Sequence, residues 1–393
     1  TLTLGSANMT LTSSVTGVVF TAATATGLTV TATTGTIKYT DAGNNAQTFA
    51  GGGKTYGNLW FSRGASTGNI TITGSNTFTD FKDDGSAAHS INFTATTTQT
   101  VTTWTVNGTS GNVITINSNT TATHALVKSG GGVIFSDYVS IQHSVATPTS
   151  TWYAGATNST NNQAVATAGS GWTFSNPTAC ISLETGNWNT AGTGDCGHVP
   201  TTADTVTVAA GHTVTMNVDS AVLGTITVNG TLNTSDGTSR ALSGTTLTIG
   251  SAGTVTANAS TITLSGTTGT PFVNNGTFTA STGTVTYTGN NAGGNTTIAN
   301  VSYNNLTLNN SSEIYVLAGT QTVSGDLTIT AGTLDTVSGQ SYGLTVGGNW
   351  SNSGIFTARS GTVTLNGTNQ TLSGTTSFYN LTKNVTSAAT LTF

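Results

Sequence analysis

The sequence is poor in charged residues, and this scarcity argues against two kinds of partner. Its 393 residues contain only 8 Lys and Arg against 13 Asp and Glu, a net charge of −5, and the basic residues form no cluster. Proteins that bind nucleic acid concentrate Lys and Arg on one surface, so we expect no nucleic-acid partner. No apolar run approaches the ~18 residues of a membrane span, so we expect no membrane insertion.

Targeting signals and helical patterns are also lacking. The chain begins Thr-Leu-Thr, without an initiator Met or a signal peptide, which indicates a mature or trimmed segment. No stretch of about ten residues places its apolar positions with the period of an amphipathic helix. With so few ionisable groups, little should titrate, so we expect the fold to tolerate a wide range of pH and salt.

Only two cysteines occur, Cys180 and Cys196. An even count in a Thr-rich, Lys-poor chain is typical of a secreted or cell-surface protein with a disulfide. The bridge would close a short loop and stabilise the fold by roughly 3 kcal/mol in the chain-entropy model. Two free buried thiols are the alternative.

What the chain does contain is Thr, Gly and alternating apolar residues. Hydrophobic residues make up 35% of the chain, and Val, Ile and Leu alternate with Thr, as in Val206-Thr207-Val208 and Leu247-Thr248-Ile249. β-Branched residues in strict alternation predict strands. The predicted fold class is therefore all-β.

One sequence motif, which we call the repeated phrase, occurs three times. Each copy opens with Gly-Thr and an aliphatic residue, and about twenty residues later an aromatic residue precedes an Asn-Leu pair. The copies are Gly35-Thr36-Ile37 with Tyr56-Gly57-Asn58-Leu59, Gly283-Thr284-Val285 with Tyr303-Asn304-Asn305-Leu306, and Gly361-Thr362-Val363 with Phe378-Tyr379-Asn380-Leu381. A period in this range predicts a repeat architecture in which each unit stacks on the next.

The repeat favours a parallel β-helix, or β-solenoid. With about 22 residues per coil, the chain would form roughly 18 coils, each pairing with its neighbours at a spacing of about 4.8 Å around a dry interior of Val, Ile and Leu. Asn-Gly pairs such as Asn229-Gly230 suit the corners of such coils. They would equally suit hairpins in an array of antiparallel β-sandwich domains, which is the alternative fold. A change of pattern at Asn176-Pro177 predicts two modules, residues 1–176 and 177–393.

The second module resembles a known kind of domain. Gly186-Asn187-Trp188, Val199-Pro200, Asp204-Thr205-Val206-Thr207-Val208 and Gly211-His212-Thr213-Val214-Thr215 resemble the opening of parallel β-helix modules in large bacterial surface proteins of the adhesin type, which also resemble the extracellular G8-type domain. In the first module, the succession from Phe78-Thr79-Asp80-Phe81 to Gly171-Trp172-Thr173-Phe174 resembles a companion repeat of such proteins. The resemblance implies a fold and a surface setting, and it hardly implies an activity.

Few residues are candidates for chemistry. Asp80, Asp83 and Asp84 form the densest acidic group, which we interpret as a solvated turn, with calcium binding as the alternative. Asp195, Cys196 and His198 are close in sequence, but zinc sites gather four ligands or three with water, and Cys180 is the expected partner of Cys196. We therefore predict no catalytic residue, no metal and no cofactor.

Aromatic residues are the best candidates for recognition. Trp152 and Tyr153 are candidates to stack on a glycan, although Trp in a strand or at the end of a module more often plugs a coil or caps the module.

The composition and the repeat together predict a function. The chain would be a non-enzymatic extracellular structural protein, a stiff segment of a bacterial cell-surface fibre, stalk or matrix filament. Its partners would be copies of itself, stacked end to end or side by side, or flanking repeats of the same chain. One alternative is an adhesin that binds glycans or other cells through exposed aromatic residues. The other is a polysaccharide-degrading β-helix enzyme, which would need carboxylates at a fixed separation along one face.

Overall fold

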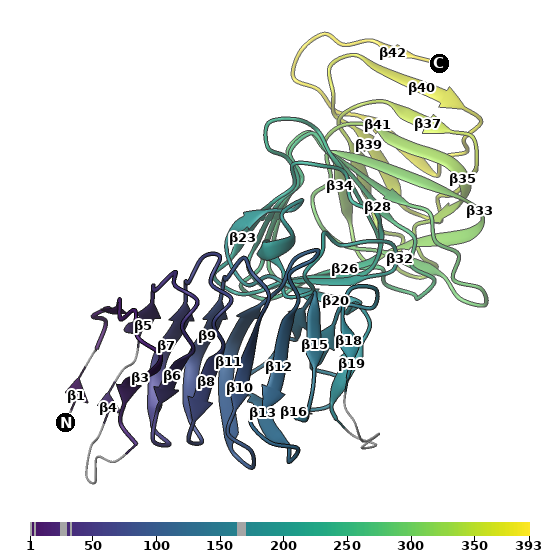
Figure 1. Ribbon diagram of the computed structural model, residues 1–393. Helices are drawn as coiled ribbons and strands as arrows, with labels where there is room; N and C mark the ends of the chain where they lie inside the picture. Colours follow the sequence, from purple (N-terminus) through teal and green to yellow (C-terminus); the bar gives the residue numbers. More distant parts are fainter. Residues whose placement is uncertain (1, 4, 24–29, 32–33, 163–169) are drawn as a thin grey trace. The chain divides into compact units, whose positions relative to one another are not determined.

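A computed structural model describes residues 2–3, 5–23, 30–31, 34–162 and 170–393 (Figure 1). Across these ranges the regular structure is β-strand, apart from one 3-10 turn, η1 (Ala191–Thr193). Neighbouring strands pair in parallel and stack into a β-solenoid of about 16 turns. The parallel β-helix predicted from the sequence is confirmed, the antiparallel sandwich array is wrong, and the coils are slightly fewer than predicted.

The contacts within the chain divide it into two compact units. The first comprises Thr1–Pro177 with Asp195–Gly197, and the second comprises Thr178–Gly194 with His198–Phe393. The division lies next to the boundary expected at residue 176, except that a three-residue segment after η1 belongs to the first unit.

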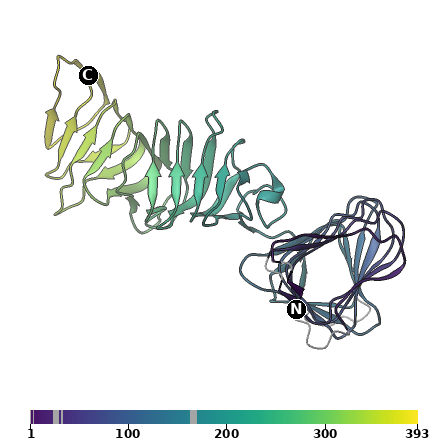
Figure 2. The same cartoon turned by 90° about the vertical axis from the view of Figure 1, so that its left-hand side faces the viewer.

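The first unit is built on two seven-stranded parallel sheets, a three-stranded sheet and a two-stranded pair. One seven-stranded sheet has the spatial order β16 (Ser144–Thr147), β13 (His124–Lys128), β11 (Thr98–Val106), β9 (Thr77–Asp83), β7 (Thr55–Phe61), β5 (Thr36–Tyr39) and β2 (Met9–Leu11). The other has the order β18 (Thr160–Asn161), β15 (Val139–Ile141), β12 (Ile114–Ser118), β10 (His89–Phe93), β8 (Ile70–Thr73), β6 (Gln47–Ala50) and β3 (Gly17–Thr21). The smaller sheets are β14 (Ile134–Ser136), β17 (Trp152–Ala154) and β19 (Trp172–Phe174), and the pair β1 (Leu2–Thr3) and β4 (Val30–Thr31). In Figure 2 the purple and blue coils of this unit superpose along the stack.

The second unit is built on three parallel sheets of 14, five and four strands. The largest follows the order β20 (Ala179–Ile181), β22 (Thr205–Val208), β24 (Val222–Val228), β26 (Ala241–Ile249), β28 (Thr261–Leu264), β31 (Thr284–Tyr287), β33 (Asn305–Leu317), β35 (Leu327–Asp335), β37 (Trp350–Asn352), β40 (Gln370–Gly374) and β42 (Leu391–Thr392), with β29 (Phe272–Asn274), β32 (Thr296–Ile298) and β38 (Ile355–Thr357) paired to β26, β33 and β35. The five-stranded sheet contains β21 (Gly186–Asn187), β23 (Thr213–Thr215), β25 (Thr231–Asn233), β27 (Thr254–Thr256) and β30 (Thr277–Thr279). The four-stranded sheet contains β34 (Gln321–Val323), β36 (Leu344–Val346), β39 (Thr362–Leu365) and β41 (Asn380–Lys383).

The repeated phrase has a structural meaning, because its two halves pair in adjacent coils. In each copy the Thr of the first half lies opposite the Asn of the second: Thr36 opposite Asn58, Thr284 opposite Asn305, and Thr362 opposite Asn380. In each copy the Asn side-chain amide also donates to the Thr hydroxyl, at 3.2, 3.4 and 3.4 Å. The phrase therefore marks three places where the same Asn–Thr side-chain hydrogen bond joins adjacent coils.

The interiors of the two units differ. Aromatic rings run through the first unit as one continuous stack, with consecutive ring centroids 4.6 to 5.7 Å apart. This aromatic spine consists of Phe20, Phe49, Tyr56, Phe78, Phe81, Trp104, Trp152 and Trp172. The second unit has the mostly aliphatic interior that the sequence predicts. The aliphatic interior that the sequence predicts is therefore incomplete for the first unit, where aromatic rings at inward positions fill the coils together with Val, Ile and Leu.

Candidate functional site

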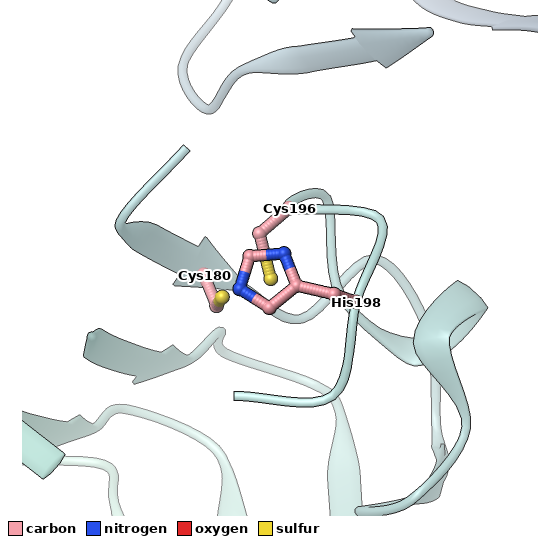
Figure 3. Close-up of side chains that lie close together, drawn as sticks. All are labelled: Cys180, Cys196 and His198. Carbon is pink, nitrogen blue, oxygen red and sulfur yellow. The ribbon is translucent and has the colours of Figure 1, made fainter. Parts of the chain in front are cut away.

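The one group of potential metal ligands in the described ranges is Cys180, Cys196 and His198 (Figure 3). Cys180 lies in β20, and the other two residues follow η1 in the chain. Their ligand atoms all lie within 4.8 Å of one another, the cysteines are buried, and His198 is half-buried. The two cysteines are disulfide-bonded, as the sequence predicts.

The chemistry of this group follows from the disulfide. A disulfide sulfur lacks the negative charge of the thiolate that zinc binds, so in this state the group offers only the imidazole of His198 as a metal ligand. His198 Nε2 lies 2.9 Å from Asp204 Oδ2. Asp204 also accepts hydrogen bonds from the Thr201 N–H at 2.7 Å and the Thr201 hydroxyl at 2.9 Å. These bonds orient the imidazole and hold the loop in place.

The acidic group at residues 80–84 is not the solvated turn that the sequence suggested. Asp83 ends β9 with its side chain in the interior, where it is 2% exposed and its Oδ2 lies 2.6 Å from Nε2 of His89. Burial lowers the pKa of His89, but the hydrogen bond and the charge of Asp83 outweigh burial and raise that pKa overall. Arg63 is buried as well and donates to the carbonyl groups of Gly68 and Asn45 at 2.7 and 2.6 Å. Only Asp84 is exposed.

The other two carboxylates lie on the outer face of the same sheet. Asp84 accepts a hydrogen bond from Trp60 Nε1 at 2.9 Å, and Asp80 accepts one from the Thr103 hydroxyl at 2.6 Å. Burial raises the pKa of Asp80. Because Asp83 points inward and each of the three carboxylates has its own partner, the group does not form a calcium loop.

Trp60 lies on this outer face between two lysines. Lys38 Nζ lies 3.5 Å from the centroid of its ring, and Lys82 Nζ lies 4.5 Å from it. The three residues occupy neighbouring strands in register. The arrangement is a cation–π stack that joins β5, β7 and β9.

The glycan-stacking prediction is wrong for Trp152. Its side chain has no exposed surface, its Nε1 donates to the carbonyl of Thr147 at 2.9 Å, and its ring packs 5.7 Å from Trp104 and 5.2 Å from Trp172. Tyr153 is on the opposite side of β17 and is half-buried. A role in glycan binding stays a prediction for Tyr153 alone.

Several buried ionisable residues were missed from the sequence, among them His124 and Glu313. His124 is 1% exposed, its Nδ1 lies 2.9 Å from the Ser118 hydroxyl, and its Nε2 has no hydrogen-bond partner. Burial and the nearby His143 lower the pKa of His124 to about 3. Glu313 is 2% exposed and accepts a hydrogen bond from the Thr296 N–H at 2.8 Å. The signal for His124 was present, because it precedes Leu126 by two residues and therefore shares its inward side.

Comparison with known proteins supports the interpretation of the second module. The model of the G8 domain family matches residues 188–302. No curated protein and no solved structure matches the chain. In the described residues, no helix has the length and apolar character required to cross a membrane. Residues 188–302 are therefore similar to a G8 domain and lie within a β-solenoid, an arrangement that fits an extracellular structural or adhesion-type protein.

Proposed function

We propose that the chain is a non-enzymatic structural segment of an extracellular fibre, a stiff β-solenoid spacer in a bacterial cell-surface stalk or matrix filament. The single observation that carries this proposal is the use of polar side chains to bond successive coils to one another. Secretion is part of the proposal, and the disulfide between Cys180 and Cys196 supports it.

The acidic residues support a structural function. Among the described residues, twelve of the 13 Asp and Glu side chains accept a hydrogen bond from another group of the fold. Ten of these residues accept from a backbone N–H: Asp41, Asp83, Asp137, Asp195, Asp204, Asp219, Asp236, Glu313, Asp326 and Asp335. The other two, Asp80 and Asp84, accept from the side chains of Thr103 and Trp60. Polysaccharide cleavage usually needs two carboxylates at a set separation beside the substrate. Here each of these carboxylates is held by its own hydrogen bonds within the fold.

A series of side-chain hydrogen bonds along the largest sheet of the second unit illustrates how successive coils are held together. Asn305 Oδ1 accepts from the Asp326 N–H at 2.9 Å, and Asp326 Oδ1 accepts from the Asn349 N–H at 2.6 Å. Asn349 Oδ1 then accepts from the Thr371 N–H at 2.8 Å. Each bond joins one coil to the next, so bending the stack would stretch side-chain bonds as well as backbone bonds.

Further coils are the proposed partners, either flanking repeats of the same chain or other copies. Leu59, Leu306 and Leu381 hold equivalent places in the repeated phrase. Leu59 and Leu306 are 0 and 1% exposed, whereas Leu381 is 39% exposed on β41, which lies at the edge of its sheet. A further parallel coil placed on this edge would cover Leu381 and pair the open strand.

Electron microscopy of cells carrying the full-length protein, labelled with an antibody against this chain, tests the proposal. Label along fibres is the expected result, and label confined to dispersed globular particles would contradict it. Incubation with neutral and acidic polysaccharides, followed by a reducing-end assay, tests the absence of activity. Wild type and the Asp204→Asn variant should both release nothing, and release by the wild type alone would identify an enzyme.

A further inference from the structure

The outer face of the five-stranded sheet carries two straight rows of hydroxyl and amide side chains. We name this sheet, formed by β21, β23, β25, β27 and β30, the threonine sheet. The first row, in register across four strands, is Thr213, Thr231, Thr254 and Thr277. The second row, in register across five strands, is Asn187, Thr215, Asn233, Thr256 and Thr279.

The rows face outward because the residues between them fill the interior. Val214, Leu232 and Val255 are 4, 0 and 0% exposed, whereas the residues of both rows are half-buried or exposed. Across the described ranges, none of the row hydroxyls or side-chain amides bonds to another protein group. No charged residue occurs in the five strands. The surface is thus neutral and regular, and its hydrogen-bonding groups are available.

The spacing of the rows is fixed by the backbone. Residues opposite each other on neighbouring strands lie about 4.8 Å apart, and residues i and i+2 of one strand about 6.7 Å apart. Thr is β-branched, so few rotamers are open to it and the array loses little entropy on binding. Each Thr presents a methyl group beside its hydroxyl.

Other hydroxyl rows of this unit lie on the four-stranded sheet, as Thr322, Thr345, Thr364 and Thr382, and on the largest sheet. The row on the largest sheet differs from the threonine sheet. Thr263, Thr286, Thr307 and Thr328 are also in register, on the largest sheet. The companion row beside them contains Asn305, Asp326 and Asn349, and their oxygen atoms already accept hydrogen bonds from the next coil. That face therefore offers one free row, whereas the threonine sheet offers two.

We propose that the threonine sheet is an ice-binding surface. The prism planes of hexagonal ice present rows of oxygen atoms whose two repeats are close to the two spacings of the array. A neutral array does not attract a charged mineral or a polyanion. A crystalline polysaccharide is usually gripped by flat aromatic rings, and the rows contain none. This inference goes beyond the spacer function and does not depend on it.

The test measures ice recrystallisation and thermal hysteresis with the purified full chain. The Thr254→Tyr variant places a bulky ring in the middle of the array. The matched control is Thr71→Tyr on β8, an equally half-buried outward Thr flanked in register by Thr48 and Asn92. We expect the wild type and the control to slow recrystallisation, and Thr254→Tyr to lose roughly fivefold or more of this activity, the equivalent of about 1 kcal/mol.

Thr231→Lys is a second array variant, for use if Thr254→Tyr does not match the wild type in its circular dichroism spectrum and unfolding midpoint. It should show the same loss. Absence of ice activity in the folded wild type would overturn the proposal, as would an equal loss in the Thr71→Tyr control. Binding of the wild type to cellulose or chitin particles without any effect on ice would reassign the surface to crystalline polysaccharide and also overturn it.

Discussion

Acid should weaken the first unit, because His124 is buried without charge. The pKa of its imidazole is about 3 in the folded chain, against 6.5 as the ordinary value. The unfolded chain therefore takes up a proton as the pH falls below 6.5, whereas the folded chain does not until about pH 3. A group with a lowered folded pKa contributes its full share of stability above pH 6.5 and loses it as the pH falls.

The size of the effect follows from the two pKa values. A difference of one pKa unit corresponds to about 1.4 kcal/mol. The loss of unfolding free energy due to His124 should therefore reach about 2 kcal/mol at pH 5 and about 3 kcal/mol at pH 4. A loss of this size would narrow the wide range of pH that so few ionisable groups lead us to expect. The stack of His124 on Phe93, with ring centroids 4.6 Å apart, leaves little room for water to relieve the charge.

Native-state hydrogen exchange, read by mass spectrometry on peptides that cover β12 and β13, measures this loss locally. Between pH 7 and pH 5 the opening free energy of the wild type should fall by about 2 kcal/mol, and that of His124→Gln should fall far less. The control His212→Gln lies in the second unit and should follow the wild type. Parallel curves for the wild type and His124→Gln would refute the reasoning.

Three further perturbations test the packing. Trp152→Ala removes the ring between Trp104 and Trp172 in the aromatic spine and should cost about 3–5 kcal/mol of unfolding free energy in urea titrations; a cost under about 1 kcal/mol would show that the rings do not support one another. Gly57→Ala places a Cβ 2.5 Å from the carbonyl oxygen of Gly35, so it should lower the thermal midpoint, whereas Gly131→Ala, with open space around its Cβ, should not; equal midpoints would contradict the close coil contact. The Cys180→Ser, Cys196→Ser double variant should lose roughly 3 kcal/mol relative to the disulfide-bonded chain, and an unchanged urea midpoint would show that the bridge adds nothing.

The sequence predicted the fold because alternation and repetition are local signals. The alternation in Val206-Thr207-Val208 predicts a strand with one buried side, and the structure has this strand as β22. The repeated phrase predicted stacking, and its halves pair in register in all three copies. The pairing itself was not predicted, because the register of parallel strands depends on how coils of unequal length close.

The interior of the first unit was harder to predict. Phe78, Phe81 and Trp104 are separated in sequence by unequal intervals, and only the closed coils bring their rings into one stack. Trp152 and Tyr153 are adjacent in sequence, and composition alone does not indicate which of them points inward. The sequence predicts a solvated turn at Asp83 because charged residues rarely enter a core, whereas its hydrogen bond with His89 allows both side chains to be buried.

The most direct test of the central claim is cryo-electron microscopy of the native cell-surface material. The account predicts fibres in which a strand repeat of about 4.8 Å runs along the fibre axis. Chains found only as separate globular particles, or strands that run along the fibre instead of across it, would contradict a spacer made of stacked coils.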